Sequence, residues 1–247
     1  MNDSAKPNYG VDAPNVLRNL FVFGGLAVLL NFVTPKTLHI GKVDIQWHES
    51  LTWMGSILLV QACLMLFYVK VGKYWHRDTM LALHSWRGDE QVLDVGCGRG
   101  LLLAGAAKRL GAGGHATGID IWSNVDMGGN SEAATRHNLE LEGVAGRCTL
   151  VGEGAQGMSF ADASFDVILS NLCLHNIYDK PTRRKAIAEI ARVLKPGGIA
   201  AISDYKLTGE YAAQLRDAGF AVERRWGNVL TTFPPLRIVI ARKPAAS

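Results

Sequence analysis

One short stretch of the chain combines an acidic residue with regularly spaced glycines. The segment VLDVGCGRG, residues 92–100, places Asp94 two positions before the first of the glycines Gly96, Gly98 and Gly100. Such glycines let a backbone pass close to a ligand, because no Cβ intrudes and positive φ costs little. The dinucleotide pattern needs a glycine where this chain has Leu101, and the phosphate-loop pattern GK[ST] is absent. We therefore expect a ligand site without a phosphate cradle.

Two later side chains could complete such a site. Asp120 ends the apolar run ATGID, a little over twenty residues past the glycine turn, where an acidic residue can accept hydrogen bonds from both ribose hydroxyls. His175 follows the run SFDVILSNLCLH, and an imidazole can remove a proton near neutral pH. His175 could instead bond only the loop backbone, with Asn176 and Tyr178 as the polar contacts. Cys173 is expected to be small core packing.

Together these motifs resemble the class I S-adenosylmethionine-dependent methyltransferases over roughly residues 88–242. The pattern Asp94-x-Gly96-x-Gly98-x-Gly100 has the form of the family's first motif, and VLKPGG, residues 193–198, that of its helix-to-strand turn. The resemblance implies S-adenosyl-L-methionine as the cofactor. A carboxylate at Asp94 suits the ammonium and sulfonium of that cofactor, where it would repel a pyrophosphate. Asp94 could also only tie the loop to its own backbone.

The resemblance also implies which residues contact the cofactor. Ile121 or Trp122 would pack on the adenine ring, and Asn171 would border the methionine part. Glu153 departs from the family's pattern, which usually has aspartate near the adenine amine. The implied cofactor-binding residues are Asp94, Gly96, Cys97, Gly98, Gly100, Asp120, Ile121, Trp122, Glu153, Gly154 and Asn171, with His175 as the catalytic base and no metal ligands.

An insertion, SNVDMGGNSEAATRHN, follows Trp122. Its glycine pair Gly128-Gly129 predicts a mobile loop that could cover the cofactor, and Asn130 or Ser131 could cap the next helix. Asp126 and Met127 would then face the acceptor, although a plain solvent loop is the alternative.

Short apolar runs alternate with helical patterns after His76, which is typical of a parallel sheet with crossover helices. We expect an α/β, Rossmann-like, doubly wound sheet of seven strands, mostly parallel with one antiparallel strand. The predicted strands are 91–95, 116–120, 148–153, 165–170, 199–204, 221–225 and 236–241, and the predicted helices are 101–110, 131–142, 183–194 and 210–218. Glycines that could end these helices in a left-handed conformation are Gly111, Gly143, Gly197 and Gly219.

Two apolar segments precede this domain. Residues 51–69, LTWMGSILLVQACLMLFYV, contain no charge and are apolar on every face, as a membrane helix requires. Residues 17–33 are a weaker candidate because Arg18, Asn19 and the pair Gly24-Gly25 interrupt them. The alternative for each is a buried core helix. We predict a membrane hairpin over residues 1–74, with helices near 17–33 and 51–71, and a catalytic domain over residues 75–247.

Positive charges predict the orientation of this hairpin. Lys70, Lys73, Arg77 and Arg87 follow the second helix, whereas Lys36 and Lys42 in the connection are balanced by Asp44 and Glu49. Lysine and arginine are retained on the cytoplasmic side, so we predict a two-pass membrane protein with both termini and the catalytic domain in the cytoplasm. Tyr68, Tyr74 and Trp75 at one end, and Trp47 and Trp53 at the other, are the predicted interfacial anchors.

The composition excludes several classes of function. Four scattered cysteines form neither a disulfide framework nor zinc spacing, and a net charge of +4 without a basic run argues against nucleic-acid binding. We predict a membrane-anchored methyltransferase acting on a small lipophilic acceptor, such as a quinone-like ring, a lipid amine or a small thiol. The alternatives are a non-catalytic anchored cofactor-binding or assembly protein and, disfavoured by Leu101 and Asp94, an NAD-dependent oxidoreductase. The sequence does not indicate an oligomeric state.

Overall fold

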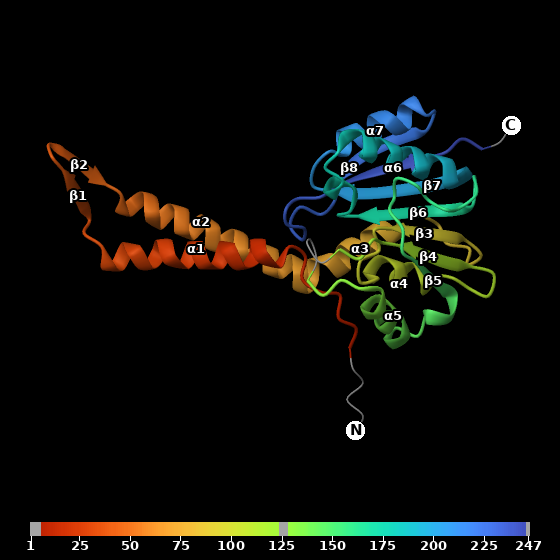
Figure 1. Cartoon of the computed structure of the whole chain (residues 1–247), viewed down its shortest axis with the longest axis horizontal. Helices are drawn as coiled ribbons and strands as arrows, with labels where there is room; N and C mark the ends of the chain where they lie inside the picture. The colour runs from red at the N-terminus through yellow and green to blue at the C-terminus, as the bar shows by residue number, and fades with distance from the viewer. Residues whose placement is uncertain (1–5, 124–127, 246–247) are drawn as a thin grey trace, which may run out of the picture.

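A helical hairpin precedes the sheet domain in the computed structural model, which describes residues 6–123 and 128–245 (Figure 1). Its helices are α1 (Pro14–Val33) and α2 (His48–Phe67), joined by a small antiparallel pair, β1 (Thr37–Ile40) and β2 (Val43–Gln46). α2 runs on without a break through a π-helical turn, η1 (Tyr68–Gly72), into α3 (Lys73–Leu81). The hairpin therefore enters the domain as one continuous helix.

The domain alternates strands and helices. Its elements are β3 (Gln91–Val95), α4 (Leu101–Ala107), β4 (His115–Ile119), α5 (Glu132–Leu141), η2 (Ala145–Arg147), β5 (Cys148–Val151), β6 (Phe165–Asn171), η3 (Leu174–Asn176), α6 (Lys180–Val193), β7 (Leu194–Asp204), α7 (Thr208–Asp217), β8 (Ala221–Trp226) and β9 (Arg237–Arg242). The strand order is β5-β4-β3-β6-β7-β9-β8, and β9 is antiparallel to both of its neighbours while the other neighbouring strands pair in parallel. This confirms the predicted seven-stranded, doubly wound α/β sheet with one antiparallel strand.

Helices cover both faces of the sheet. One core cluster joins α6 and α7 to the sheet through residues such as Ile187 and Leu215, and a second joins α3, α4 and α5 through Leu81, Leu103 and Leu139. Strand order reverses between β3 and β6, so the carboxyl ends of these two strands flank the position where such folds bind ligands.

Almost all of the hairpin lies outside these cores. Only 11% of the most apolar window of α1 is buried, and 28% of that of the His48–Leu81 helix. Gly24 and Gly55 bring α1 and α2 together, since a Cβ on Gly24 would lie 2.9 Å from Leu59 Cγ and one on Gly55 would lie 2.9 Å from Val28 Cγ2. Both helices are long and apolar enough to cross a membrane, and a core helix of a water-soluble protein would be mostly buried.

Several local predictions need correction. The connection between the hairpin helices contains β1 and β2, which its mixed polar sequence did not suggest. Segment VLKPGG joins α6 to β7 as expected, but the strand already begins at Leu194, with an irregular register, and not at residue 199. Gly111 does not have the positive φ expected of it, because α4 ends earlier, at Ala107, whereas Gly143, Gly197 and Gly219 do.

Candidate functional site

The glycine turn after β3 adopts a backbone that only glycine takes easily. Gly96, Gly98 and Gly100 have φ values of 72°, 51° and 84°. A Cβ on Gly96 would also lie 2.2 Å from Cys173 Sγ, so the loop after β6 rests directly on this turn. The amides of Gly96 and Cys97 donate to the carbonyl of Ile119 at 2.9 and 3.0 Å, which fixes the turn against β4.

β3 aims Asp94 toward α3 and α4, on the same face as Val92, because alternate residues of a strand share a face. Asp94 is 1% exposed, and its Oδ2 has no hydrogen-bond partner among the described residues. Burial, with a smaller contribution from the negative charge of Asp120, raises the pKa of Asp94 to about 8. An unpaired buried carboxyl is costly, so this side chain fits a cationic group supplied by a ligand.

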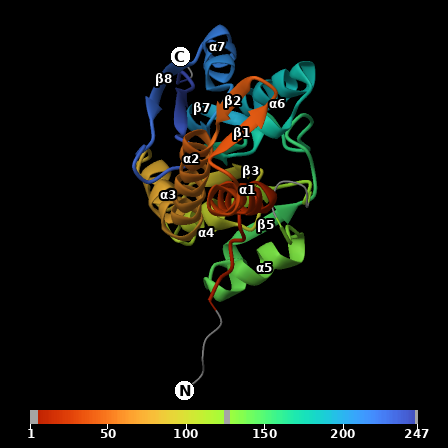
Figure 2. The same ribbon diagram turned by 90° about the vertical axis from the view of Figure 1, so that its left-hand side faces the viewer.

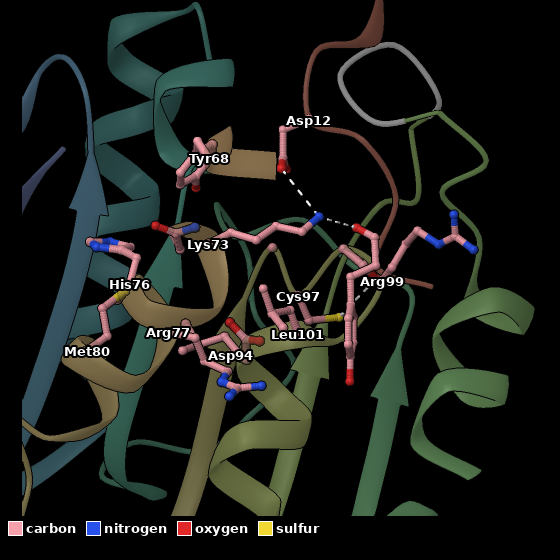
Figure 3. A pocket seen from close by; sticks show the side chains of 15 residues that line it. Asp12, Tyr68, Lys73, His76, Arg77, Met80, Asp94, Cys97, Arg99 and Leu101 are labelled. Atoms are coloured by element: carbon pink, nitrogen blue, oxygen red, sulfur yellow. Dashed lines mark hydrogen bonds and ion pairs between the residues drawn. The ribbon is translucent and has the colours of Figure 1, made fainter. Parts of the chain in front are cut away.

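A pocket that is partly open to solvent surrounds this carboxyl (Figure 3). The predicted residues that line it are Asp94, Gly96, Cys97, Gly98 and Asn171. Its other walls come from outside the predicted set: Tyr9 and Asp12 before α1, Tyr68, Lys73, His76, Arg77 and Met80 on the helix that continues from the hairpin, and Arg99, Leu101 and Leu102.

Residues 8–12, which we name the N-terminal strap, form one side of the pocket. Asn8 exchanges two hydrogen bonds with the side chain of Asn138, both 2.9 Å long, and Tyr9 donates to Glu142. Lys73 Nζ donates to the carbonyls of Tyr9 and Gly10 at 3.0 and 2.7 Å and lies 3.7 Å from Asp12 Oδ2. Figure 3 shows Lys73 reaching across the pocket toward Asp12. The pocket is therefore closed by chain segments on both sides of the hairpin.

Sequence reasoning missed these walls. Tyr9 and Asp12 are separated from Asp94 by the whole hairpin, so no local spacing connects them. One signal was present: Lys73, His76 and Arg77 recur at helical spacing directly after the apolar run, which places them on one face of a helix.

Asp120 supports the glycine turn from the end of β4. Its carboxylate accepts from the amides of Gly98 at 2.8 Å and Trp122 at 2.6 Å. The hydroxyl of Thr135 donates to the carbonyl of Gly98 at 2.6 Å, so α5 holds the turn from the other side. Ser131 caps α5 by accepting from Ala134, and Asn130 donates to Asp120 instead.

The residues predicted to lie near the adenine ring are not among those that line the pocket. Ile121 is 70% exposed, and Trp122 adopts a positive φ of 47° with its ring against Gly152. Glu153 accepts from the amide of Ser159 at 3.2 Å. Gly154 follows on the same connection and also lies outside the pocket lining. Asp126 and Met127 lie outside the described residues.

His175 and Asp204 form a pair at the ends of neighbouring strands. His175 follows β6, Asp204 ends β7 and is fully buried, and His175 Nδ1 lies 2.8 Å from Asp204 Oδ1. The ring does not point its nitrogen along the line to that oxygen, so the contact has ion-pair distance without the alignment of a hydrogen bond. The amide of His175 and the hydroxyl of Tyr211 also approach Asp204, at 3.2 and 3.3 Å. His175 itself does not line the pocket around Asp94.

The two cysteines near the turn are packing residues. Cys97 Sγ would lie 2.8 Å from a Cβ on Gly118, so its side chain packs against β4. Burial raises the thiol pKa of both Cys97 and Cys173, which keeps them neutral. This agrees with the packing role expected of Cys173.

The sequence is similar to those of known methyltransferases. Residues 93–202 match the family described as "Methyltransferase domain". The chain is 30% identical over 168 residues to the "Ubiquinone/menaquinone biosynthesis C-methyltransferase UbiE" of Vibrio parahaemolyticus, covering 66% of this chain and 61% of that one. It is 33% identical over 132 residues to the "Demethylmenaquinone methyltransferase" of Listeria welshimeri, covering 53% and 50%.

A solved structure shows the same fold. The SAM-dependent methyltransferase from Aquifex aeolicus superimposes with a TM-score of 0.54 and 22% identity, covering 67% of this chain and 88% of that one. The matches to the first curated relatives span about 40% to 61% of those proteins' lengths.

Proposed function

We propose that the protein is a class I S-adenosylmethionine-dependent methyltransferase that methylates a small lipophilic acceptor at a membrane, since residues 93–202 match the family described as "Methyltransferase domain". The observation that carries the proposal is the unpaired, buried Asp94 in a pocket beside the glycine turn. Bound S-adenosylmethionine supplies an electrophilic methyl group on a sulfonium. Asp94 would hold its ammonium, and Asp120 would accept from its ribose hydroxyls.

We propose that His175 removes the proton of the acceptor. It stands beyond β6, on the loop that begins at Asn171, and the buried Asp204 lies against its Nδ1 and leaves Nε2 for the acceptor. A carboxylate behind an imidazole stabilises the imidazolium that forms on proton transfer. Methyl transfer itself needs no covalent enzyme intermediate, since positioning and exclusion of water lower the barrier.

The names of the relatives favour a quinol-like ring as the acceptor. Such a ring carries an acidic hydroxyl, and its deprotonation activates both the oxygen and the ring carbons toward an electrophile. This chemistry suits the His175–Asp204 pair and a membrane location, because quinone-type molecules dissolve in bilayers. We further propose that α1 and α2 span the membrane, with both termini and the domain in the cytoplasm, as the charge pattern predicts.

The function is tested with purified full-length protein, methyl-labelled S-adenosylmethionine and a membrane lipid extract. We expect label in the extractable small-molecule fraction, and His175→Ala is expected to lower kcat about 10²–10⁴-fold, the usual contribution of a general base, with cofactor affinity unchanged. His137→Ala, an exposed histidine on α5, is the matched control. Binding of the cofactor without transfer would support a non-catalytic binding protein, and label only in protein or RNA would overturn the lipophilic acceptor.

A further inference from the structure

We propose that the domain rests on the lipid bilayer through the face formed by the carboxyl ends of its parallel strands, and that the tip of the β8–β9 loop enters the lipid. We name this surface the carboxyl-edge face. The inference rests on the proposed membrane insertion of α1 and α2. It adds a second membrane contact, made by the catalytic domain itself.

Exposed large apolar side chains are confined to this face. Among the described residues after Phe67, the exposed ones are Trp75, Ile121, Tyr178, Tyr205, Trp226, Val229 and Leu230. Ile121, Tyr178 and Tyr205 follow β4, β6 and β7, and Trp75 lies on α3 beside the hairpin. Arg237 of β9 pairs with Trp226 at the end of β8 and with Asp204 at the end of β7. The loop 227–236 between β8 and β9 therefore lies at the same edge of the sheet. In the described residues, the connections at the opposite edge expose no such side chain.

Two cations on this face lie against aromatic rings. Arg237 stacks on Trp226 with its guanidinium carbon 3.9 Å from the ring centroid, and Lys206 lies 5.2 Å from the ring of Tyr205 and 5.9 Å from that of Tyr178. Aromatic rings and basic side chains are the residues that settle at the headgroup level of a membrane. Apolar side chains scattered at random over a surface would not be expected to lie beside basic side chains in this way.

The length of α1 leaves no spare helical segment between the domain and the bilayer. α1 has 20 residues, which corresponds to about 30 Å, the thickness of a hydrocarbon core. It must therefore enter the lipid from its first turn, and it begins only two residues after Asp12, which lines the pocket. The hairpin also leaves the domain on the side where the β8–β9 loop lies, as Figure 1 shows, and Figure 2 views the molecule from that side.

The β8–β9 loop is fixed to the end of the membrane helix. A Cβ on Gly72 would lie 1.8 Å from the carbonyl oxygen of Thr231, so the two backbones are in close contact. Leu236 packs with Tyr68 and Val69 of η1. Val229 and Leu230 directly precede the first of these attachments, and Leu230 is 83% exposed. Since the loop cannot swing away, its tip must face whatever surrounds the emerging hairpin, and that is lipid.

Spin labels in the full-length protein test this arrangement. Leu230→Cys is made in a Cys63→Ser background, labelled, and reconstituted into vesicles of phosphatidylcholine and phosphatidylglycerol. Labelling of the Cys63→Ser protein alone measures the signal from the three remaining cysteines, which is then subtracted. Gly146→Cys, on an open turn before β5 at the opposite edge, is the aqueous control, and Leu29→Cys on α1 is the membrane control.

We expect the label at residue 230 to relax more strongly with oxygen than with a water-soluble nickel chelate, and the label at residue 146 to do the reverse. A water-exposed label at residue 230 together with a lipid-exposed label at residue 29 would overturn the inference while leaving the anchoring intact. Water exposure at both positions would instead refute the proposed membrane insertion. As a second measure, Leu230→Glu should raise KM several-fold for a vesicle-borne acceptor and leave KM for a water-soluble analogue unchanged.

Discussion

Asp94 shows how a single residue links the fold to its ligand. Its strand position buries the carboxyl, its neighbours leave one oxygen unpaired, and the pocket beside it is partly open to solvent. In the absence of a cation the neutral form is favoured, which is why the pKa rises to about 8. A ligand ammonium favours the ionised form, so binding should release a proton.

Cofactor affinity is therefore expected to rise with pH between about 6 and 9, as the free carboxyl ionises, and to level above its pKa of about 8. Asp94→Asn should weaken S-adenosylmethionine binding at least tenfold, about 1.4 kcal/mol, and remove this pH dependence. Titration calorimetry over that pH range measures both. Asp217→Asn, an exposed carboxylate on α7, is the control, and an unchanged pH profile in Asp94→Asn would exclude the assigned role.

At the scale of elements, the parallel strands and the glycine turn could be predicted from sequence, because periodicity and local motifs specify them. Asp94, Gly96 and Gly98 lie where their motif implies, and strand β3 has the predicted bounds. The pocket walls supplied by Tyr9, Tyr68 and Lys73 could not be predicted from the sequence, because they depend on how the hairpin packs against the sheet domain. Tyr68 illustrates the difference: it was predicted to be an interfacial anchor, but it is 2% exposed and packs on Leu236.

The hairpin depends on its two contact glycines. Gly24→Val and Gly55→Val are each expected to lower its stability by about 1–3 kcal/mol, the usual cost of overpacking, because a side chain at either position would meet the other helix within 3 Å. Gly25→Val is the matched control, since no atom lies within 4 Å of its Cβ position. Thermal unfolding in detergent micelles compares the three, and equal melting temperatures would argue against this helix contact.

At the scale of the whole molecule, the strap joins the two ends of the hairpin to the domain. Asn138 illustrates this arrangement, because its side chain bonds Asn8 in the strap and also donates to the carbonyl of Arg99 in the glycine turn at 2.9 Å. Lys73, on the helix that continues from the hairpin, makes the corresponding link to the strap. The strap, the glycine turn and this helix thus share one set of hydrogen bonds.

Lys73→Met should loosen the strap. Hydrogen bonds from a charged group contribute about 1.5–3 kcal/mol, so cleavage of residues 8–12 by a protease is expected to accelerate roughly tenfold or more, with weaker cofactor binding. Lys70→Met removes an exposed lysine one turn earlier and should change neither. Cleavage at the wild-type rate in Lys73→Met would show that other contacts hold the strap.

The unbroken helix from His48 to Leu81 has a practical consequence for the isolation of the enzyme. A water-soluble fragment that begins at residue 75, where the composition changes, would discard Tyr9, Asp12, Tyr68 and Lys73 and with them one side of the pocket. The sheet domain therefore cannot be cut from the hairpin at that point without opening the pocket. In this protein, removal of the apolar hairpin also removes part of the candidate binding site.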